Sequence, residues 1–304
     1  MVKVGLALPQ LGEHVTAQAF AEFCRRAESV GFSSLWAQEH LFYPEHARSG
    51  YAGVPGLPIP AQYRSVLAPT EAMAYAAALT STVAIGSSIL VGGYHRPLEL
   101  AQRLATLDVL SGGRVVVGLS VGWSDDEHEQ MDVDPRTRGR RMDELVEALL
   151  ACWGPDPVSF EGEFFQIPES SVRPKPLQSP HPPLLSGMWS PAGIERTIAR
   201  FDIWNPARGE PAELAGQLAD MNRRRPAGTA PLRLFYRSFA QRPTHRPGEP
   251  VEGVDGVVLD IEACRRAGVE EVIVECNFWE AMDSPSAWAG APELLVPALE
   301  AASG

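Results

Sequence analysis

Short strand-like runs alternate with helical apolar patterns from one end of this 304-residue chain to the other. In the first pair, the apolar run Val2–Leu8 precedes a segment from Phe20 to Val30 in which apolar residues recur every three or four positions, the stripe of an amphipathic helix. Further strands are expected at 33–37, 83–89, 115–119, 183–187, 202–205, 232–239 and 271–276. Helices are expected near 67–80, 97–107, 142–153, 191–200, 211–224, 255–267 and 292–302. Such alternation predicts a parallel sheet with right-handed crossovers.

Eight β–α units in a chain of this length favour an α/β fold of the (β/α)8 TIM-barrel type over an open doubly wound sheet. An open sheet that binds a dinucleotide carries G-x-G-x-x-G after its first strand, whereas this chain has Pro9-Gln10-Leu11-Gly12 there. The irregular segment 154–182 lies between the fourth helix and the fifth strand, and the runs flanking Glu161-Gly162-Glu163 predict a small hairpin in it. Because no break in composition divides the chain, we expect one domain over residues 1–304 with this insertion.

Acidic residues outnumber basic ones by 38 to 26, which gives a formal net charge of −12. Binding to nucleic acid or to an anionic membrane surface needs a basic surface, so we expect neither partner. A phosphate-bearing ligand stays compatible with this charge, because backbone N–H groups at the start of a helix bind phosphate locally. The N-terminus lacks the pattern of a signal peptide and no stretch is as long as a membrane span, so we expect a cytoplasmic protein.

Two groups of residues that often bind metals are assigned other roles. The four cysteines are Cys24, Cys152, Cys264 and Cys276. They lie far apart and form no C-x-x-C pair, so we expect buried thiols, which suit a reducing compartment, rather than a zinc site. The acidic residues after the fourth strand are Asp125, Asp126, Glu127 and Glu129. We expect them on the solvated face of a short helix, and we expect no metal site.

The ends of the predicted strands indicate where a catalytic site would lie, because active sites of such barrels form at the C-terminal ends of the strands. His40 follows the strand 33–37 and adjoins the loop 41–64, which is rich in glycine, proline and aromatic residues. A long aromatic loop is typical of a functional segment. We therefore expect His40 to donate a hydrogen bond or a proton near neutral pH. The side chains expected to form an apolar substrate pocket are Phe42, Tyr43, Trp123 and Trp204.

Two other strand ends carry residues with alternative interpretations. Gly122 either lets the backbone approach a flat or phosphorylated ligand, or is an ordinary turn beside a packed Trp123. In Gly187-Met188-Trp189-Ser190-Pro191, Ser190 is a good N-cap and Pro191 a good first helical residue. Such a start either binds phosphate through its N–H groups or is simply capped.

Three blocks of sequence resemble those of the luciferase-like monooxygenase family. The blocks are Leu104–Arg114 with its continuation to Gly122-Trp123, then Arg138–Glu144, then Val158–Phe164. The similarity keeps the order of the family and extends over nearly the whole chain. It implies a barrel with a flavin-type ring across its C-terminal mouth and a non-proline cis peptide at Ser88-Ile89. The residues that it implies for cofactor binding are Ser88, Ile89, Val121, Gly122, Gly187, Met188 and Ser190.

One part of the resemblance is imperfect. The phosphate site of the family has two glycines followed by Asn-Ser, whereas this chain has Gly187-Met188-Trp189-Ser190. A histidine after the second strand resembles the deazaflavin branch, which implies coenzyme F-420 and hydride transfer to or from an organic small molecule. The alternatives are an FMN-dependent monooxygenase that uses oxygen, and a degenerate barrel that only binds a ligand or partner, which the Met188-Trp189 departure would favour. The resemblance also implies a homodimer.

Overall fold

The computed structural model describes residues 1–239 and 253–304, and in these ranges eight parallel strands close into a barrel. The strands are β1 (Lys3–Ala7), β2 (Ser34–Ala37), β3 (Ala84–Ser87), β5 (Val115–Ser120), β8 (Leu184–Ser186), β9 (Ile203–Trp204), β10 (Arg233–Phe239) and β11 (Glu271–Glu275). Each pairs with the next, and β11 pairs with β1 to complete the ring. The predicted (β/α)8 barrel is therefore confirmed.

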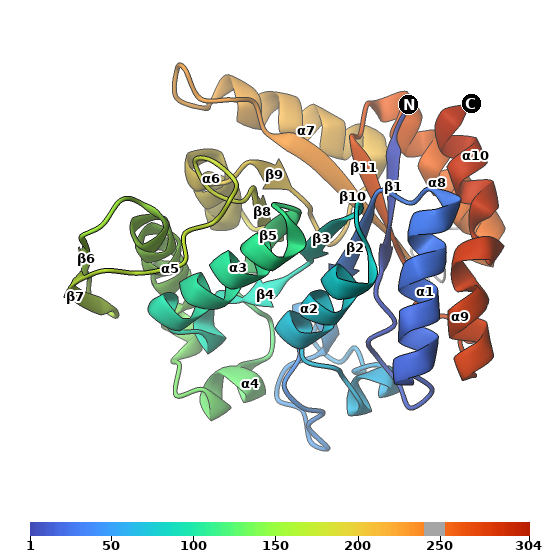
Figure 1. The fold of residues 1–304 in the computed structure, drawn as a ribbon, viewed down its shortest axis with the longest axis horizontal. Helices are drawn as coiled ribbons and strands as arrows, with labels where there is room; N and C mark the ends of the chain where they lie inside the picture. The colour runs from blue at the N-terminus through green and yellow to red at the C-terminus, as the bar shows by residue number, and fades with distance from the viewer. Residues whose placement is uncertain (240–252) are drawn as a thin grey trace.

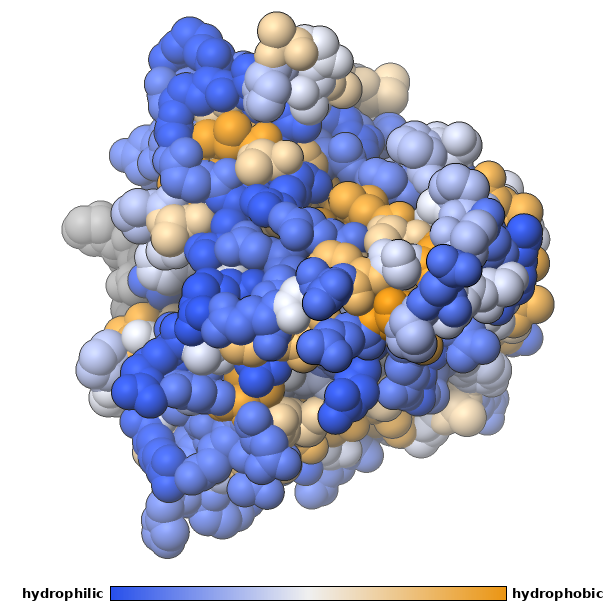
Figure 2. Space-filling model, turned by 90° about the vertical axis from the view of Figure 1, so that its left-hand side faces the viewer, coloured by the Kyte–Doolittle hydropathy of each residue, from blue (hydrophilic) through white to orange (hydrophobic). Residues whose placement is uncertain are grey.

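Helices cover the outside of this barrel (Figure 1). They are α1 (Ala17–Val30), α2 (Pro69–Leu79), α3 (Pro97–Ser111), α5 (Arg138–Trp153), α6 (Pro191–Arg200), α7 (Pro211–Arg223), α8 (Gly253–Ala267), α9 (Pro285–Leu294) and α10 (Val296–Ser303), with a short α4 (Asp125–Gln130). An antiparallel hairpin of β6 (Val158–Glu161) and β7 (Gln166–Ser170) lies between α5 and β8, so the predicted insertion is confirmed. The face on the hairpin side is largely hydrophilic, with hydrophobic side chains in groups between polar ones (Figure 2).

The C-terminal helix differs from the expectation. Instead of one helix over 292–302, the structure has α9 and α10, which meet at Leu295. Ser284 caps α9 and Pro285 is its first residue, a start signal that the apolar pattern did not show. Pro297 lies in the first turn of α10, where it has no N–H to donate to the preceding turn, so α9 ends before it.

Apolar side chains fill the barrel and separate its two ends. The inner cluster consists of Trp36, Leu185, Ile203, Phe235 and Ile273. Gly86 makes room for it, since a Cβ at Gly86 would lie 2.3 Å from Cζ3 of Trp36. A larger cluster lies between the strands and the helices. Because the interior is packed, a ligand site is expected at an end of the barrel rather than along its axis.

The ladder between β3 and β5 is bridged by a side chain where β3 ends. Gly86 pairs with Val116, and pairing resumes where β4 (Leu90–Val91) meets the end of β5. Between these points, Ser87 Oγ donates to the carbonyl of Gly118 over 2.9 Å and accepts from its N–H over 2.8 Å. The peptide bond Ser88-Ile89 that follows is cis, as the family resemblance implied.

The remaining expectations about the fold concern cysteines and membranes. All four cysteines belong to the described residues, are buried and carry thiols rather than disulfides, as expected. In residues 1–239 and 253–304, no helix is both long enough and apolar enough to span a bilayer.

Candidate active site

His40 forms a hydrogen bond at the C-terminal mouth of the barrel with a carboxylate that the sequence analysis assigned to the surface. The two residues after β2 lead to His40, whose Nδ1 lies 2.9 Å from Oε1 of Glu127. Glu127 is on α4, and its side chain is only 2% exposed. The expectation that it lies on a solvated face was wrong, because its side chain turns inward to His40, the N–H of Leu41 and the hydroxyl of Tyr94. Ser124 caps this helix by accepting from the N–H of Glu127.

Hydrogen bonds fix the charge of Glu127 and the tautomer of His40. Burial acts to raise the pKa of Glu127, but hydrogen bonds from His40, from the N–H of Leu41 and from the hydroxyl of Tyr94 outweigh it, so this pKa is lowered. The last two bonds measure 2.8 and 2.7 Å. An ionised carboxylate only accepts, so Nδ1 of His40 carries a proton. Nε2 is therefore the ring nitrogen left to exchange a proton with a ligand.

The lowered pKa of Glu127 predicts how its contribution to stability depends on pH. Glu127→Gln is expected to lower the free energy of unfolding by about 1–3 kcal/mol at neutral pH, because a charged, buried acceptor is lost. A carboxylate whose pKa is lower in the folded state stabilises the fold above its unfolded pKa. The difference between wild type and variant should therefore shrink as pH falls below 4.5 and through the lowered pKa.

Urea unfolding across this pH range measures the effect. Glu129→Gln is the matched control, since Glu129 lies on the same helix but its side chain is 54% exposed and pairs with Arg48 at the surface. Exposed pairs contribute little, so the control should change little at any pH. A difference for Glu127→Gln that stayed constant or widened toward acid would contradict the prediction.

Aromatic rings surround His40 and close the mouth of the barrel. The ring centroid of His40 lies 4.1 Å from that of Tyr63 and 5.3 Å from that of Trp123. Tyr51 contacts both of these residues, and Phe278 contacts both tyrosines. We call Tyr51, Tyr63, Trp123 and Phe278 the aromatic cap. Tyr51 begins the short helix η1 (Tyr51–Gly53) and Tyr63 lies in η2 (Ala61–Arg64), so the loop 41–64 covers the mouth.

The four residues predicted to form the substrate pocket lie in different parts of the structure. Trp123 lies beside His40 as expected, and Phe42 is half-buried in the loop. Tyr43 packs under the guanidinium of Arg64 at 4.1 Å. Trp204 does not reach the mouth: it is fully buried in the cluster between strands and helices. The reason is strand alternation, because Ile203 faces the barrel interior and its neighbour therefore faces outward.

The residues expected to contact a cofactor ring gather on one side of the mouth. A Cβ at Gly187 would lie 2.8 Å from Cγ2 of Ile89, so these two strand ends are adjacent. Ser88 Oγ donates to Asn205 over 2.9 Å. Gly122 has φ +75, and a Cβ there would approach His128 to 2.8 Å, so this glycine is required by internal packing.

The altered segment lies directly before α6 and packs against the first turn of this helix. Ser190 caps the helix by accepting from the N–H of Gly193, as predicted. Met188 turns into the core, where it is buried. Trp189 points outward, with 44% of its surface exposed, and the guanidinium of Arg208 lies 4.2 Å from its ring. The departure thus places a cation near the helix N-terminus.

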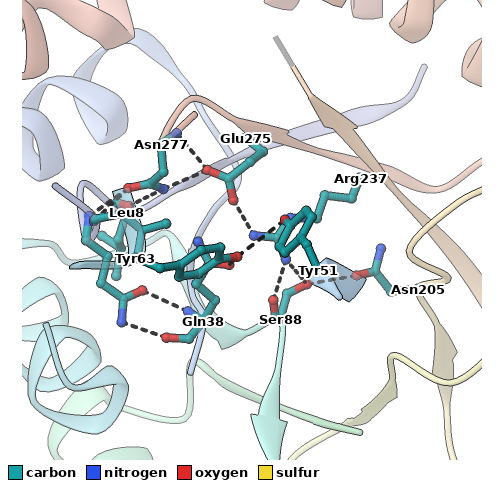
Figure 3. Close-up of polar contacts among 11 residues, drawn as sticks. Leu8, Gln38, Tyr51, Tyr63, Ser88, Asn205, Arg237, Glu275 and Asn277 are labelled. Atoms are coloured by element: carbon teal, nitrogen blue, oxygen red, sulfur yellow. Dashed lines mark hydrogen bonds and ion pairs between the residues drawn. The ribbon is translucent and has the colours of Figure 1, made fainter. Parts of the chain in front are cut away.

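A chain of polar side chains crosses the mouth from β10 to the end of β2, and the sequence analysis had not identified it (Figure 3). Arg237 on β10 donates to Glu275 on β11 and to the carbonyl of Ser88. Burial acts to lower the pKa of Arg237, but the charge of Glu275 outweighs it, and this pKa is raised. Asn277 donates to Glu275 over 2.7 Å through both its N–H and its side chain. Gln10 joins Asn277 to the residue after β2: its N–H donates to Oδ1 of Asn277 over 2.9 Å, and its side chain donates to the carbonyl of Gln38 over 2.7 Å.

Comparison with known proteins assigns this barrel to a family. The sequence model of the luciferase-like monooxygenases matches residues 4–241. The chain belongs to the luciferase-like monooxygenase family. This luciferase-like protein is therefore an oxidoreductase, and its paired His40 and Glu127 lie at the mouth where barrels of this type carry their active sites. In the described ranges, no group of three or more His, Cys, Asp or Glu side chains is arranged to hold a metal ion.

Three similar proteins illustrate the range of the family. A protein of Mycobacterium tuberculosis, described as uncharacterized, is 35% identical over 199 residues, which cover 64% of this chain and 67% of that protein. The FMNH2-dependent dimethylsulfone monooxygenase of Pseudomonas putida is 30% identical over 166 residues, 53% of this chain and 45% of that enzyme. The coenzyme F420-dependent tetrahydromethanopterin reductase of Methanopyrus kandleri has a TM-score of 0.69 at 17% identity, over 97% of this chain and 99% of that one. The last likeness shows the fold alone.

Proposed function

We propose that this luciferase-like protein transfers a hydride between coenzyme F-420 and an organic small molecule, with His40 as the acid–base group. The observation that carries the proposal is the hydrogen bond between His40 Nδ1 and the ionised Glu127 at the barrel mouth. A hydride added to a carbonyl carbon leaves an oxygen that must gain a proton, and the reverse reaction must remove it. Nε2 of His40 supplies or accepts that proton, while Glu127 holds the ring in place and stabilises its charged form.

The residues at the mouth of the barrel fit a ring bearing a phosphate. Ile89 and Gly187 lie together at two strand ends, and the side chain of Ile89 occupies the space that a Cβ of Gly187 would need, so Ile89 would form one wall for the ring. Met188 is buried against the first turn of α6, where a Cβ at Gly193 would lie 2.7 Å from the Cβ of Met188. The cation of Arg208, which lies beside Trp189, would hold a phosphate near this helix start. Bound there, the deazaflavin supplies a carbon that gives or takes a hydride.

A second function is favoured by one relative. The enzyme of Pseudomonas putida is FMNH2-dependent, which supports an oxygen-using monooxygenase with FMN in the same mouth. The acid–base pair supports the first function more strongly, because proton exchange with substrate is needed at each hydride transfer to or from an oxygen-bearing carbon.

Equilibrium binding of the two cofactors separates these functions. The full chain is titrated with F-420 and with FMN while fluorescence is followed, and we expect F-420 to bind at least about tenfold more tightly. Arg208→Ala should weaken F-420 binding several-fold, because a charge near the phosphate is lost. Arg223→Ala, which removes an exposed arginine of α7, should leave binding unchanged. Tighter binding of FMN would favour the monooxygenase, and binding of neither would contradict both functions.

A further inference from the structure

Two buried N–H groups at the barrel mouth have no hydrogen-bond acceptor. In residues 1–239 and 253–304, the buried side-chain atoms without a partner are Gln38 Nε2, Arg237 Nε and Arg225 Nε. Arg225 lies elsewhere and donates through Nη1 to the carbonyl of Phe201. Gln38 is only 8% exposed, and Arg237 belongs to the polar chain of the mouth. Buried donors without acceptors are unfavourable and seldom retained, so an acceptor supplied by a ligand is the expected reason for them.

The surrounding hydrogen bonds leave these donors free and also leave one acceptor free. Tyr63 donates its hydroxyl proton to Oε1 of Gln38 over 3.4 Å. The hydroxyl of Tyr51 lies 3.4 Å from that of Tyr63 and is then the donor of that pair. The oxygen of Tyr51 therefore keeps its lone pairs. Figure 3 shows both tyrosines between Gln38 and Arg237, so the hydroxyl of Tyr51 lies between the two side chains that carry these N–H groups.

The charges around this region select the kind of group that binds. The guanidinium of Arg237 is already paired with Glu275, whose side chain is fully buried. On the other side of the cap, Glu127 is ionised. An incoming carboxylate would thus meet no uncompensated positive charge from Arg237, and it would lose its hydration on entering. A neutral oxygen needs only the N–H groups, and a hydroxyl can also donate to Tyr51.

We propose that Gln38 and Arg237 bind the neutral oxygen of a carbonyl or hydroxyl group in the substrate. The inference rests on the proposed function in taking this mouth as the place of reaction. The aromatic cap, in which the rings of Tyr51 and Tyr63 lie against each other, contacts the apolar body of the same molecule. Glu275 is a positioning residue that fixes Arg237.

Four probes of equal ring size test the proposal. Cyclohexanone, cyclohexanol, cyclohexanecarboxylate and methylcyclohexane differ only in the group attached to or within the ring. Their binding to the full chain is measured by ligand-observed NMR, first as purified and then with whichever cofactor it binds. The ketone and the alcohol should bind at least about tenfold more tightly than the other two. Equal binding of methylcyclohexane, or tighter binding of the carboxylate, would overturn the proposal.

Two substitutions at Gln38 make the test specific. Gln38→Met removes all polar atoms, whereas Gln38→Glu keeps an acceptor for Tyr63 and replaces the N–H donors by a carboxyl oxygen. Both should weaken the ketone about tenfold or more. Gln38→Met should lower the thermal midpoint only slightly, because the bond that it loses is the 3.4 Å bond from Tyr63 and Nε2 has no partner in the free protein. A purely structural glutamine would instead give a lower midpoint with ketone binding unchanged. Gln18→Met, at an exposed position of α1, is the control.

The outcomes separate this proposal from the cofactor assignment. Unchanged ketone binding in both Gln38 variants would overturn the oxygen site, even if F-420 binds as expected. If the wild-type chain prefers the ketone and the alcohol and both Gln38 variants lose this preference, the site would be supported, even if F-420 does not bind. Neither result requires turnover.

Discussion

His40→Asn is expected to lower kcat by about 10²–10⁴-fold while leaving the fold and the cofactor affinity nearly unchanged. The amide nitrogen of asparagine reaches the position of Nδ1, so the bond of 2.9 Å to Glu127 can persist. What the variant lacks is Nε2, the nitrogen assigned to proton exchange with the substrate. His46→Asn is the matched control, because His46 is exposed in the same loop.

The measurements are kcat at saturating cofactor and substrate, the dissociation constant of the cofactor, and the thermal midpoint. A purely structural His40 would give a lower midpoint with kcat nearly preserved, the reverse of the expected pattern. Glu127→Gln should reduce kcat by less than His40→Asn, since it acts only by orienting and stabilising the imidazole. The double variant should then be little slower than His40→Asn alone, because the two residues act as one unit.

The sequence could predict the barrel because apolar residues recur with one period in its strands and with another in its helices. Even the short β9 was anticipated, since Ile203 and Trp204 stand between two clear helices. The end of the chain was predicted less well. Mostly apolar residues run through both α9 and α10, so the apolar pattern does not show where α9 ends. The only mark of that end is Pro297, which has no N–H to donate to the preceding turn.

The site was only partly predictable, for a physical reason. His40 was found because a strand end fixes its position. Glu127 was missed because four acidic residues in a short helix suggest a solvated face, and only tertiary packing decides which of them turns inward. Arg237 and Glu275 were missed because barrel strands are buried on both faces, so sequence does not show which alternate residues point inward. Tyr51 and Tyr63 belong to a loop whose course has no periodicity.

Gly118→Ala is expected to destabilise the protein by more than about 4 kcal/mol or to prevent folding. A Cβ at this position would lie 1.8 Å from the carbonyl oxygen of Ser87 and 2.9 Å from its carbon. Both are backbone atoms, so no side-chain rotation relieves the overlap. The strands β3 and β5 would have to separate, and the two hydrogen bonds between Ser87 Oγ and Gly118 would be lost with them.

Chemical unfolding of three variants tests whether the overlap with the backbone of Ser87 causes this loss of stability. Gly216→Ala, in α7, places a Cβ where no atom lies within 4 Å, so it should stabilise by about 0.5–1 kcal/mol through helix propensity alone. Ser87→Ala should cost about 1–3 kcal/mol, because it leaves the N–H and carbonyl of Gly118 unpaired without adding an atom. Gly118→Ala should exceed Ser87→Ala, since it adds the backbone overlap to the same lost bonds. If both cost the same, the hydrogen bonds alone would explain the requirement for glycine. The comparison also bears on the active site, because Ser88, which binds Arg237 and Asn205 at the mouth, directly follows Ser87.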